Sequence, residues 1–205
     1  MARTRDEAAR SRVLSAARDL ICELGPRAVT VDGIAAAAGV GKQTIYRWWP
    51  SKSAVVMDAL IEMTDPEPAD TPHSARETLR LQMRRVARMF SSRQGQLIRE
   101  ILAESQGDPE LAEEFRRRFF AHRRARAATT ITRGIVSGEL RPDLNIDDAL
   151  DVLAAPLWLQ LLVGPRPPTQ RTADRLFSLV WPALASPAAS APPSATPCPS
   201  PPGGR

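Results

Sequence analysis

The stretch VDGIAAAAGVGKQTIYRW, residues 31–48, decides the fold of this chain. It predicts two short helices, at about 31–38 and 42–49, that cross at a steep angle through a turn of three or four residues. Such a crossing requires a small residue inside the first helix, and Ala35 supplies it. It also requires a residue that tolerates positive φ at the turn four positions later, and Gly39 supplies it. The stretch therefore predicts a helix-turn-helix.

The two helices are expected to share a core and to leave one polar face free. The residues expected in the core are Ile34, Ala38, Val40, Ile45 and Trp48. The outward face of the second helix would carry Lys42, Gln43, Thr44, Tyr46 and Arg47. These side chains suit base edges and phosphates, so the face predicts binding to double-stranded DNA. An ordinary helical hairpin is the alternative, but it gives no reason for this set of outward residues.

Charge and composition agree with a DNA-binding protein of ordinary solubility. The chain has 205 residues, 43% of them hydrophobic, and a net charge of +5. Residues 1–60 carry nine Lys and Arg against six Asp and Glu, and both lysines of the chain, Lys42 and Lys52, lie there. A basic N-terminal region is expected of a segment that meets a polyanion.

Several other classes of protein are disfavoured. No window approaches the roughly 20 apolar residues of a membrane span, and the N-terminus lacks the apolar core of a secretory signal, so a cytoplasmic location without membrane contact is expected. Cys22 and Cys198 have no metal-type spacing. Residues 39–44 only partly match a phosphate-binding loop, because Ala36 and Gln43 stand where that loop needs Gly and Ser or Thr. With no nucleophile–base set either, we predict no catalytic residue, no metal and no cofactor.

The pattern is helical almost throughout and predicts an all-α fold. Residues 1–50 would form a three-helix helix-turn-helix domain, and a helix at 51–63 would connect it to a helical domain spanning 51–185. The expected helices are 4–24, 31–38, 42–49, 51–63, 74–91, 97–106, 109–137, 147–163 and 170–185. Residues 64–73 contain three prolines and indicate a linker. Residues 186–205 are rich in Pro, Ser and Ala, which predicts a disordered tail.

Residues spread over about 8–60 resemble the DNA-binding domain of TetR/AcrR-family regulators. The resemblance rests on Val29-Thr30-Val31, Ile34-Ala35, Ala38-Gly39-Val40, Thr44-Ile45-Tyr46, Trp49, Ser51-Lys52 and Leu60. Residues 103–111 and 138–143 more weakly resemble the family's C-terminal domain. The chain departs from the family pattern at Gly33, where an acidic residue is common, and at Gly41, where Ser is frequent.

The resemblance implies roles for particular residues. Thr30, Tyr46 and Lys52 match positions that usually hold the phosphate backbone. Lys42, Gln43, Thr44 and Arg47 lie on the recognition helix. The implied protein is a ligand-controlled homodimer, most simply a repressor, that binds a pseudo-palindromic operator.

The helix expected at 147–163 is apolar nearly all round, so it needs cover on more than one side. We expect it to pair with the helix at 170–185 and with the same two helices of a second subunit. The interface residues predicted are Leu157, Leu161, Leu162, Leu176 and Val180. The alternative is burial wholly within one subunit.

A pocket for a small, mostly apolar effector is expected among the helices at 74–137. Its candidate walls are Leu79, Met83, Val86, Phe90, Ile101, Phe119 and Trp158, although plain core packing explains any single one of them better than ligand contact does. His122 and Gln106 are the polar side chains that stand out as candidate contacts. The arginine run at 116–126 is interpreted as a solvated face.

Two alternatives to a ligand-responsive regulator remain at the level of sequence. One is a small helical enzyme or protein-interaction module that uses the hairpin structurally. The other is a DNA-binding protein with no effector, which would have a solid core in its C-terminal domain.

Overall fold

The computed structural model describes residues 2–64 and 74–187, with side chains described from Glu7 onward. Those residues form helices and no β-strand, which confirms the all-α prediction; one isolated bridge joins Leu140 to Ala185. The elements are α1 (Ala2–Leu24), α2 (Val31–Ala38), α3 (Lys42–Tyr46), α4 (Lys52–Thr64), α5 (Ala75–Phe90), α6 (Arg93–Ser105), α7 (Pro109–Glu114), the π-helix η1 (Phe115–Phe120), α8 (Ala121–Val136), α9 (Ile146–Val163) and α10 (Gln170–Leu184).

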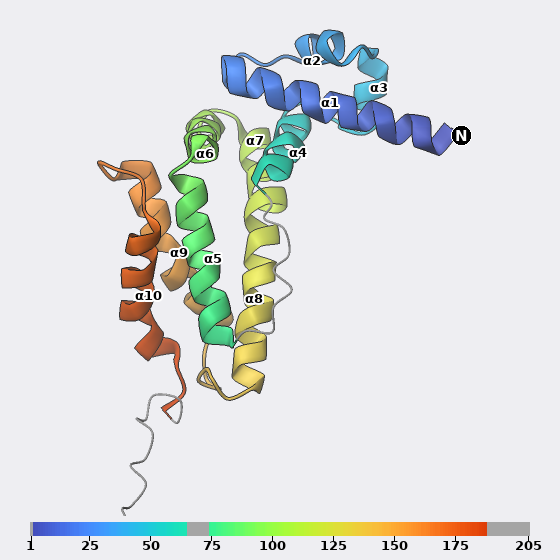
Figure 1. Cartoon of the computed structure of the whole chain (residues 1–205). Helices are drawn as coiled ribbons and strands as arrows, with labels where there is room; N and C mark the ends of the chain where they lie inside the picture. Colours follow the sequence, from blue (N-terminus) through green and yellow to red (C-terminus); the bar gives the residue numbers. More distant parts are fainter. Residues whose placement is uncertain (1, 65–73, 188–205) are drawn as a thin grey trace, which may run out of the picture.

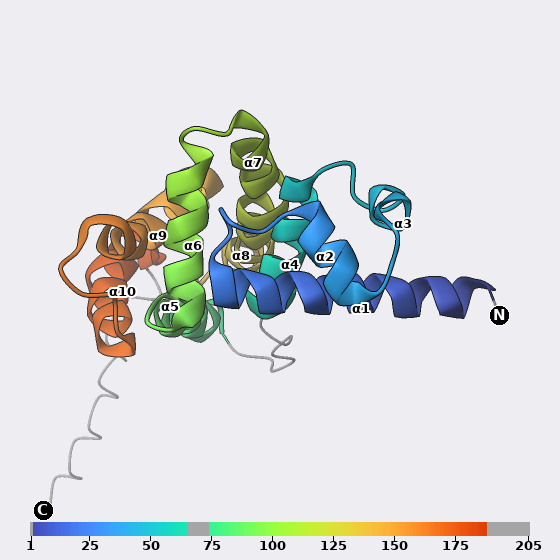
Figure 2. The ribbon, with the colours of Figure 1, turned by 90° about the horizontal axis from the view of Figure 1, so that it is seen from above.

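The molecule has an N-terminal unit set across one end of a helical bundle. Figure 1 shows α1, α2 and α3 at that end, with α5, α8, α9 and α10 running side by side away from it. Helix α4 leads from the N-terminal unit into the bundle, where it contacts α6, α7 and η1. The view from above in Figure 2 shows α2 and α3 on one side of α1, clear of the bundle. This arrangement leaves α3 at the outer surface.

The core of the N-terminal unit follows from apolar residues at helical spacing. Helix α1 buries Val13, Leu14, Ala17 and Ile21. Against them lie Ile34, Ala35 and Ala38 of α2 and Ile45 of α3, all of them buried as the sequence predicts. Ala35 is the residue that allows the two short helices to approach closely.

Two of the predicted core residues, Val40 and Trp48, are only partly buried and pack against the core from its edge. Trp48 is only half-buried, and Trp49 is the tryptophan that fills the core, with 1% of its surface exposed. Helix α3 ends at Tyr46, three residues earlier than predicted, although the Trp49 amide still donates to the Ile45 carbonyl at 3.0 Å, the bond of an α-helical turn. Trp49 therefore lies on the same side of the chain as the buried Ile45, four residues before it.

Other boundaries differ modestly from the predictions. Helix α6 begins at Arg93 rather than 97, and the helix predicted at 109–137 is divided by the π-helix η1. Helix α4 extends to Thr64, so the predicted linker can begin only at 65. The rest of that linker, and all of the predicted tail except Ser186 and Pro187, lie outside the described residues.

The turn between α2 and α3 depends on two glycines in different ways. Gly39 ends α2 with φ of 63°, and its amide bonds back to the α2 carbonyls, so it takes the left-handed conformation that L side chains disfavour. Gly41 precedes α3 with φ of −76°, an ordinary value, and no side chain caps the first turn of α3. A Cβ at either position would meet no atom within 4 Å.

We predict opposite effects for substitutions at these two glycines. Gly39→Ala should lower the free energy of unfolding by about 1 kcal/mol, because alanine disfavours the left-handed backbone conformation at this position. The added Cβ meets no other atom, so no further cost is expected. Gly41→Ser should raise it by a few tenths of a kcal/mol, since a hydroxyl there can cap α3. Urea denaturation of the two variants measures both values. Equal effects of the two substitutions would contradict this account of the turn.

Candidate nucleic-acid interface and effector cavity

Helix α3 presents the polar face that the sequence predicts. Ile45 is fully buried and fixes the helix to the core, while Lys42, Gln43, Tyr46 and Arg47 are exposed and Thr44 is half-buried. Tyr46 has 51% of its surface exposed, a large value for an aromatic residue. An anchored helix with cationic and amide side chains on its free side can enter a major groove and reach base edges.

Thr30 lies at the edge of the same surface. Its hydroxyl accepts a hydrogen bond from the Gly33 amide at 3.0 Å and so caps α2. The side chain is exposed. It therefore has a structural role in addition to the phosphate contact that the resemblance implies.

Three cationic side chains of this surface make contacts with other residues of the same chain. Lys42 Nζ lies 2.5 Å from the Asp32 carboxylate, and the Arg47 guanidinium lies over the Trp48 ring at 4.8 Å. Lys52 Nζ lies 3.4 Å from Glu104 of α6, and its side chain is 31% exposed. Lys52 thus joins the start of α4 to the C-terminal domain, a contact that sequence reasoning missed.

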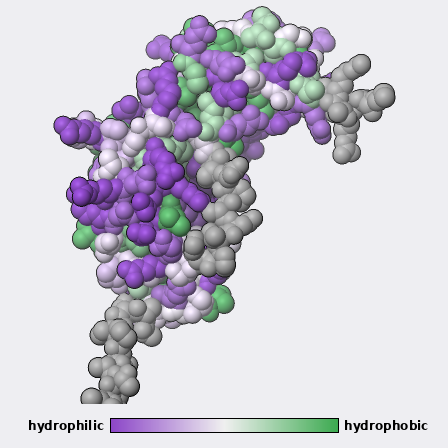
Figure 3. Space-filling model, in the orientation of Figure 1, coloured by the Kyte–Doolittle hydropathy of each residue, from purple (hydrophilic) through white to green (hydrophobic). Residues whose placement is uncertain are grey.

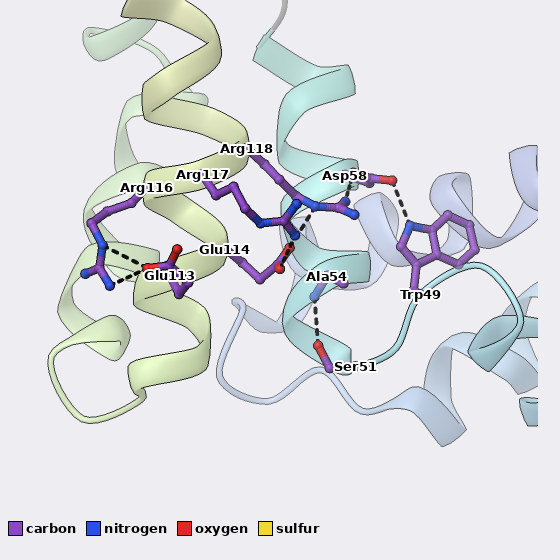
Figure 4. Close-up of polar contacts among 9 residues, drawn as sticks. All are labelled: Trp49, Ser51, Ala54, Asp58, Glu113, Glu114, Arg116, Arg117 and Arg118. Carbon is purple, nitrogen blue, oxygen red and sulfur yellow. Dashed lines mark hydrogen bonds and ion pairs between the residues drawn. The ribbon is translucent and has the colours of Figure 1, made fainter.

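The carboxylate of Asp58 on α4 joins the N-terminal unit to the bundle (Figure 4). Trp49 Nε1 donates to Asp58 Oδ2 at 2.7 Å, and Arg118 of η1 forms an ion pair with the other oxygen, Oδ1. Arg10 of α1 adds a longer contact with Oδ2 at 3.3 Å. Arg118 also contacts Glu114 at 2.7 Å. This group, Trp49, Asp58, Arg118 and Glu114, is called the Asp58 network below.

The arginine run is not simply a solvated face, so that interpretation is wrong for part of it. Arg116 and Arg117 do pair along the helix with Glu113 and Glu114, and the hydrogen bond to Glu114 raises the pKa of Arg117. Arg118, however, is largely covered and bridges two elements. Asp58 was the signal in the sequence that could have indicated this bridge. It is the one charged residue between Lys52 and Glu62, and an isolated acid in an apolar helix needs a partner.

The bundle contains a cavity of about 120 Å³ between α5, α8 and α9. Leu79, Met83, Val86, Phe90 and Trp158 line it as predicted, together with Leu153. Ile101 and Phe119 do not: both are buried in the core away from the cavity, and these two predictions are corrected. Helices α6 and η1 both contact α4, and the Phe119 ring stacks on Phe115 with centroids 5.0 Å apart.

The polar residues of the cavity are not the expected ones. His122 and Gln106 are exposed and do not line it. Gln82, Arg123 and Arg124 do. Arg124 pairs with Asp147 at 2.7 Å and with Asp151, and these hydrogen bonds raise its pKa. Sequence reasoning missed the two arginines because they belong to the run that was interpreted as solvated, and it did not single out Gln82 of α5.

The predicted dimer residues divide into two groups. Leu157 and Leu161 are buried within the subunit, so they have almost no surface left for a partner, and their assignment to an interface is corrected. Leu162 is half-exposed, and Leu176 and Val180 are partly exposed. The large apolar side chains that α9 and α10 leave most exposed are Val152, Leu159, Leu162, Val163 and Leu179. The face in Figure 3 is mainly hydrophilic, with hydrophobic residues exposed in small separate areas.

Two further features bear on the kind of site. The described residues contain no group of three or more His, Cys, Asp or Glu able to hold a metal ion. Within the same ranges, no helix combines the length and apolar character needed to cross a bilayer.

Comparison with known proteins agrees with the helix-turn-helix geometry. Residues 13–59 match the model of the bacterial regulatory proteins of the tetR family, and residues 68–180 match the tetracyclin repressor-like C-terminal domain. The chain is 42% identical over 162 residues to the HTH-type transcriptional regulator YdeS of Bacillus subtilis, covering 78% of this chain and 82% of that one. It is 31% identical over 169 residues to the regulator Rv1556 of Mycobacterium tuberculosis, covering 80% and 82%.

Solved structures show the same fold. The crystal structure of the TetR family transcription regulator SCO0332 aligns with a TM-score of 0.70 at 28% identity, covering 86% of this chain and 98% of that one. A regulator from Saccharomonospora viridis in complex with choline aligns at 0.59 with 22% identity, covering 87% and 98%, a likeness of fold alone.

These matches define a class of protein: a helix-turn-helix transcription regulator that binds DNA, and not an enzyme. The chain belongs to the TetR family.

We predict that the Asp58 network stabilises the contact between the two parts of the molecule. Asp58→Asn should lower the free energy of unfolding by about 1–3 kcal/mol, because it leaves the largely covered Arg118 without one of its carboxylates. Glu62→Gln, an exposed change one turn further along α4, is the control and should have little effect. Denaturant unfolding of Asp58→Asn, Arg118→Gln and the double variant gives the coupling between them. Additive effects would show that the ion pair contributes nothing.

Proposed function

We propose that this regulator is a ligand-responsive repressor that binds a pseudo-palindromic operator as a homodimer. The observation that carries the proposal is the exposed polar face of α3, held on the buried Ile45 at the outer end of the molecule. A repressor of this kind lowers transcription by occupying the operator and leaves it when an effector binds the C-terminal domain.

In this proposal each subunit places α3 in a major groove. Gln43 and Arg47 are exposed and carry the amide and guanidinium groups that read adenine and guanine edges. The phosphate contacts come from Thr30, Lys42, Tyr46 and Lys52, and half-buried Thr44 supports them from the inner edge of the helix. A dimer would read two half-sites about 34–36 Å apart, or a multiple of that distance.

The exposed apolar residues of α9 and α10 support a dimer formed by these helices. Val152, Leu159 and Leu162 lie seven and three residues apart, which places them along one side of α9. Leu159 is 62% exposed and Leu179 of α10 is 72% exposed. A second subunit with the same two helices would bury these side chains in a four-helix contact.

The cavity supports the effector part of the proposal, and the chain offers a physical route from it to the DNA surface. The continuous rod formed by η1 and α8 carries Phe120, Arg123 and Arg124, which line the cavity, and Arg118, which belongs to the Asp58 network. An effector that shifts this rod would shift α4 and the end of α3 with it. It can favour the released form only by the difference between its affinities for the two forms.

DNA binding is tested with the duplex upstream of the protein's own gene. We predict a specific shift at low salt, with Gln43→Ala costing about 1–3 kcal/mol of sequence discrimination because it removes a base contact. Lys42→Ala should instead weaken binding to every sequence and lower the salt slope by about one, since it removes a phosphate contact. Gel shifts over a range of salt concentrations measure both effects.

Asp32→Asn is the matched control for the second variant, because it removes the partner of Lys42 and keeps the cation. Its binding should equal or exceed that of the unaltered protein. Absence of any shift at low salt would favour the alternative of a helical interaction module. Identical behaviour of Gln43→Ala and Lys42→Ala would refute the division of α3 into base-reading and phosphate-holding residues.

We predict that Leu159→Glu converts the dimer to monomers, because it places a charge in the apolar contact between subunits. Sedimentation velocity measures the change in mass. Val136→Glu introduces the same charge at another highly exposed apolar residue, at the end of α8, and should leave the dimer intact. A dimer that survives Leu159→Glu would place the interface elsewhere.

A further inference from the structure

Lys52 has two candidate partners, one on the DNA and one on its own chain. It begins α4, and the proposed function gives it a phosphate contact. In the structure its ammonium group lies instead 3.4 Å from Oε1 of Glu104, on α6 of the C-terminal domain. Both side chains are more covered than those of the Lys42–Asp32 pair, which lies within the N-terminal unit. One ammonium group is thus available to two anions.

The Glu104 carboxylate needs this cation. It lies in the last turn of α6, where the helix dipole disfavours a negative charge. Its second oxygen, Oε2, is buried and has no hydrogen-bond partner among the described residues. Removing the cation from a largely covered carboxylate is costly, because the remaining charge is left uncompensated. Glu104 therefore holds Lys52 more strongly than a fully exposed acid would.

The surroundings of Glu104 are acidic. It lines a wide hollow between the end of α1, with the turn that follows, and α6, with the turn that follows. The charged residues lining the described part of this hollow are Glu23, Glu100, Glu104, Asp108, Arg27 and Arg93. A phosphate near enough to share the Lys52 ammonium group would approach these carboxylates and be repelled. The two contacts of Lys52 therefore exclude one another.

We propose that Glu104 competes with the DNA backbone for Lys52 and thereby lowers the affinity of the protein for every duplex. Binding transfers the ammonium group from the carboxylate to a phosphate and breaks this contact between α4 and α6. The affinity for DNA then depends on how α6 lies against α4, and by linkage a bound duplex weakens the same contact. This inference rests on the proposed function, because it takes Lys52 as a phosphate ligand.

Glu104→Gln tests the competition, because it removes the charge and keeps the size of the side chain. In gel shifts of the full-length protein at one salt concentration, it should tighten binding by about two- to fivefold, the range expected for one partly exposed ion pair. The gain should be the same for the upstream duplex and for a duplex of scrambled sequence, since a phosphate contact carries no sequence information. Glu100→Gln removes the same charge one turn earlier on α6, without freeing Lys52, and should change the affinity less.

A double-variant cycle separates competition for Lys52 from a general effect of charge. Lys52→Gln should weaken binding, because it removes a phosphate contact. In that background Glu104→Gln should have no more effect than Glu100→Gln, since there is no ammonium group left to release. Glu104→Asp keeps the charge but withdraws it from a contact that is already 3.4 Å long. It should therefore tighten binding by a smaller factor than Glu104→Gln.

Weaker binding by a folded Glu104→Gln variant would overturn the inference, because Glu104 would then orient Lys52 toward the phosphate. An equal gain from Glu100→Gln, or a gain from Glu104→Gln that persists with Lys52→Gln, would also overturn it, since either would show only long-range charge. If circular dichroism shows that Glu104→Gln does not fold, Glu104→Asp decides: tighter binding supports the inference, and unchanged or weaker binding overturns it.

The outcomes also distinguish this inference from the proposed function. A shift that Lys52→Gln leaves unchanged would overturn the inference and leave the proposed DNA binding intact. Absence of any shift with the unaltered protein at low salt would refute both.

Discussion

One carboxylate sets the relation between the DNA-facing helices and the rest of the molecule. The Asp58 carboxylate accepts a hydrogen bond from Trp49, at the end of the helix-turn-helix, and forms an ion pair with Arg118 of the bundle. Arg10 of α1 lies close to the same carboxylate oxygen as Trp49. A largely buried charge is costly unless it is paired and hydrogen-bonded. Breaking any of these contacts costs free energy, so together they restrict how the N-terminal unit can tilt on the bundle. A regulator needs a defined tilt between these two parts.

The π-helix belongs to the same constraint. A single π turn in an α-helical rod is uncommon and often marks a functional site. Here η1 carries Arg118 toward α4, and within two to six residues along the same rod Phe120, Arg123 and Arg124 line the cavity. The segment thus connects the two surfaces at which this protein would meet its DNA and its effector.

Much of the N-terminal unit could be predicted from the sequence because local chemistry decides it. Gly39 and Ala35 define the crossing of α2 and α3, and the exposed side of α3 follows once Ile45 is buried. The buried tryptophan was misassigned because Trp48 and Trp49 lie three and four residues after Ile45, and helical spacing places both near its side.

The C-terminal domain was predictable in its helices and less so in its contacts. A helix that is apolar all round, such as α9, shows that several faces are covered but not which neighbour covers each. Leu157 and Leu161 turned out to face their own subunit, while Leu162 faces outward. The roles of Arg118 and Arg124 depend on Asp58, Asp147 and Asp151, which lie 23 to 60 residues away in the sequence, and a run of arginines does not indicate such partners.

The chain's shortage of lysine has a practical consequence. Its two lysines stand beside or within the helix-turn-helix, and every other cationic side chain is arginine, apart from the histidines when protonated. Amine-directed chemistry, whether acylation by a reagent or coupling to a sensor surface, can therefore reach this chain only there and at its N-terminal amine. Protection of these two amines by a bound duplex would be a direct footprint of DNA on the protein, while immobilisation through them would mask the very surface under study.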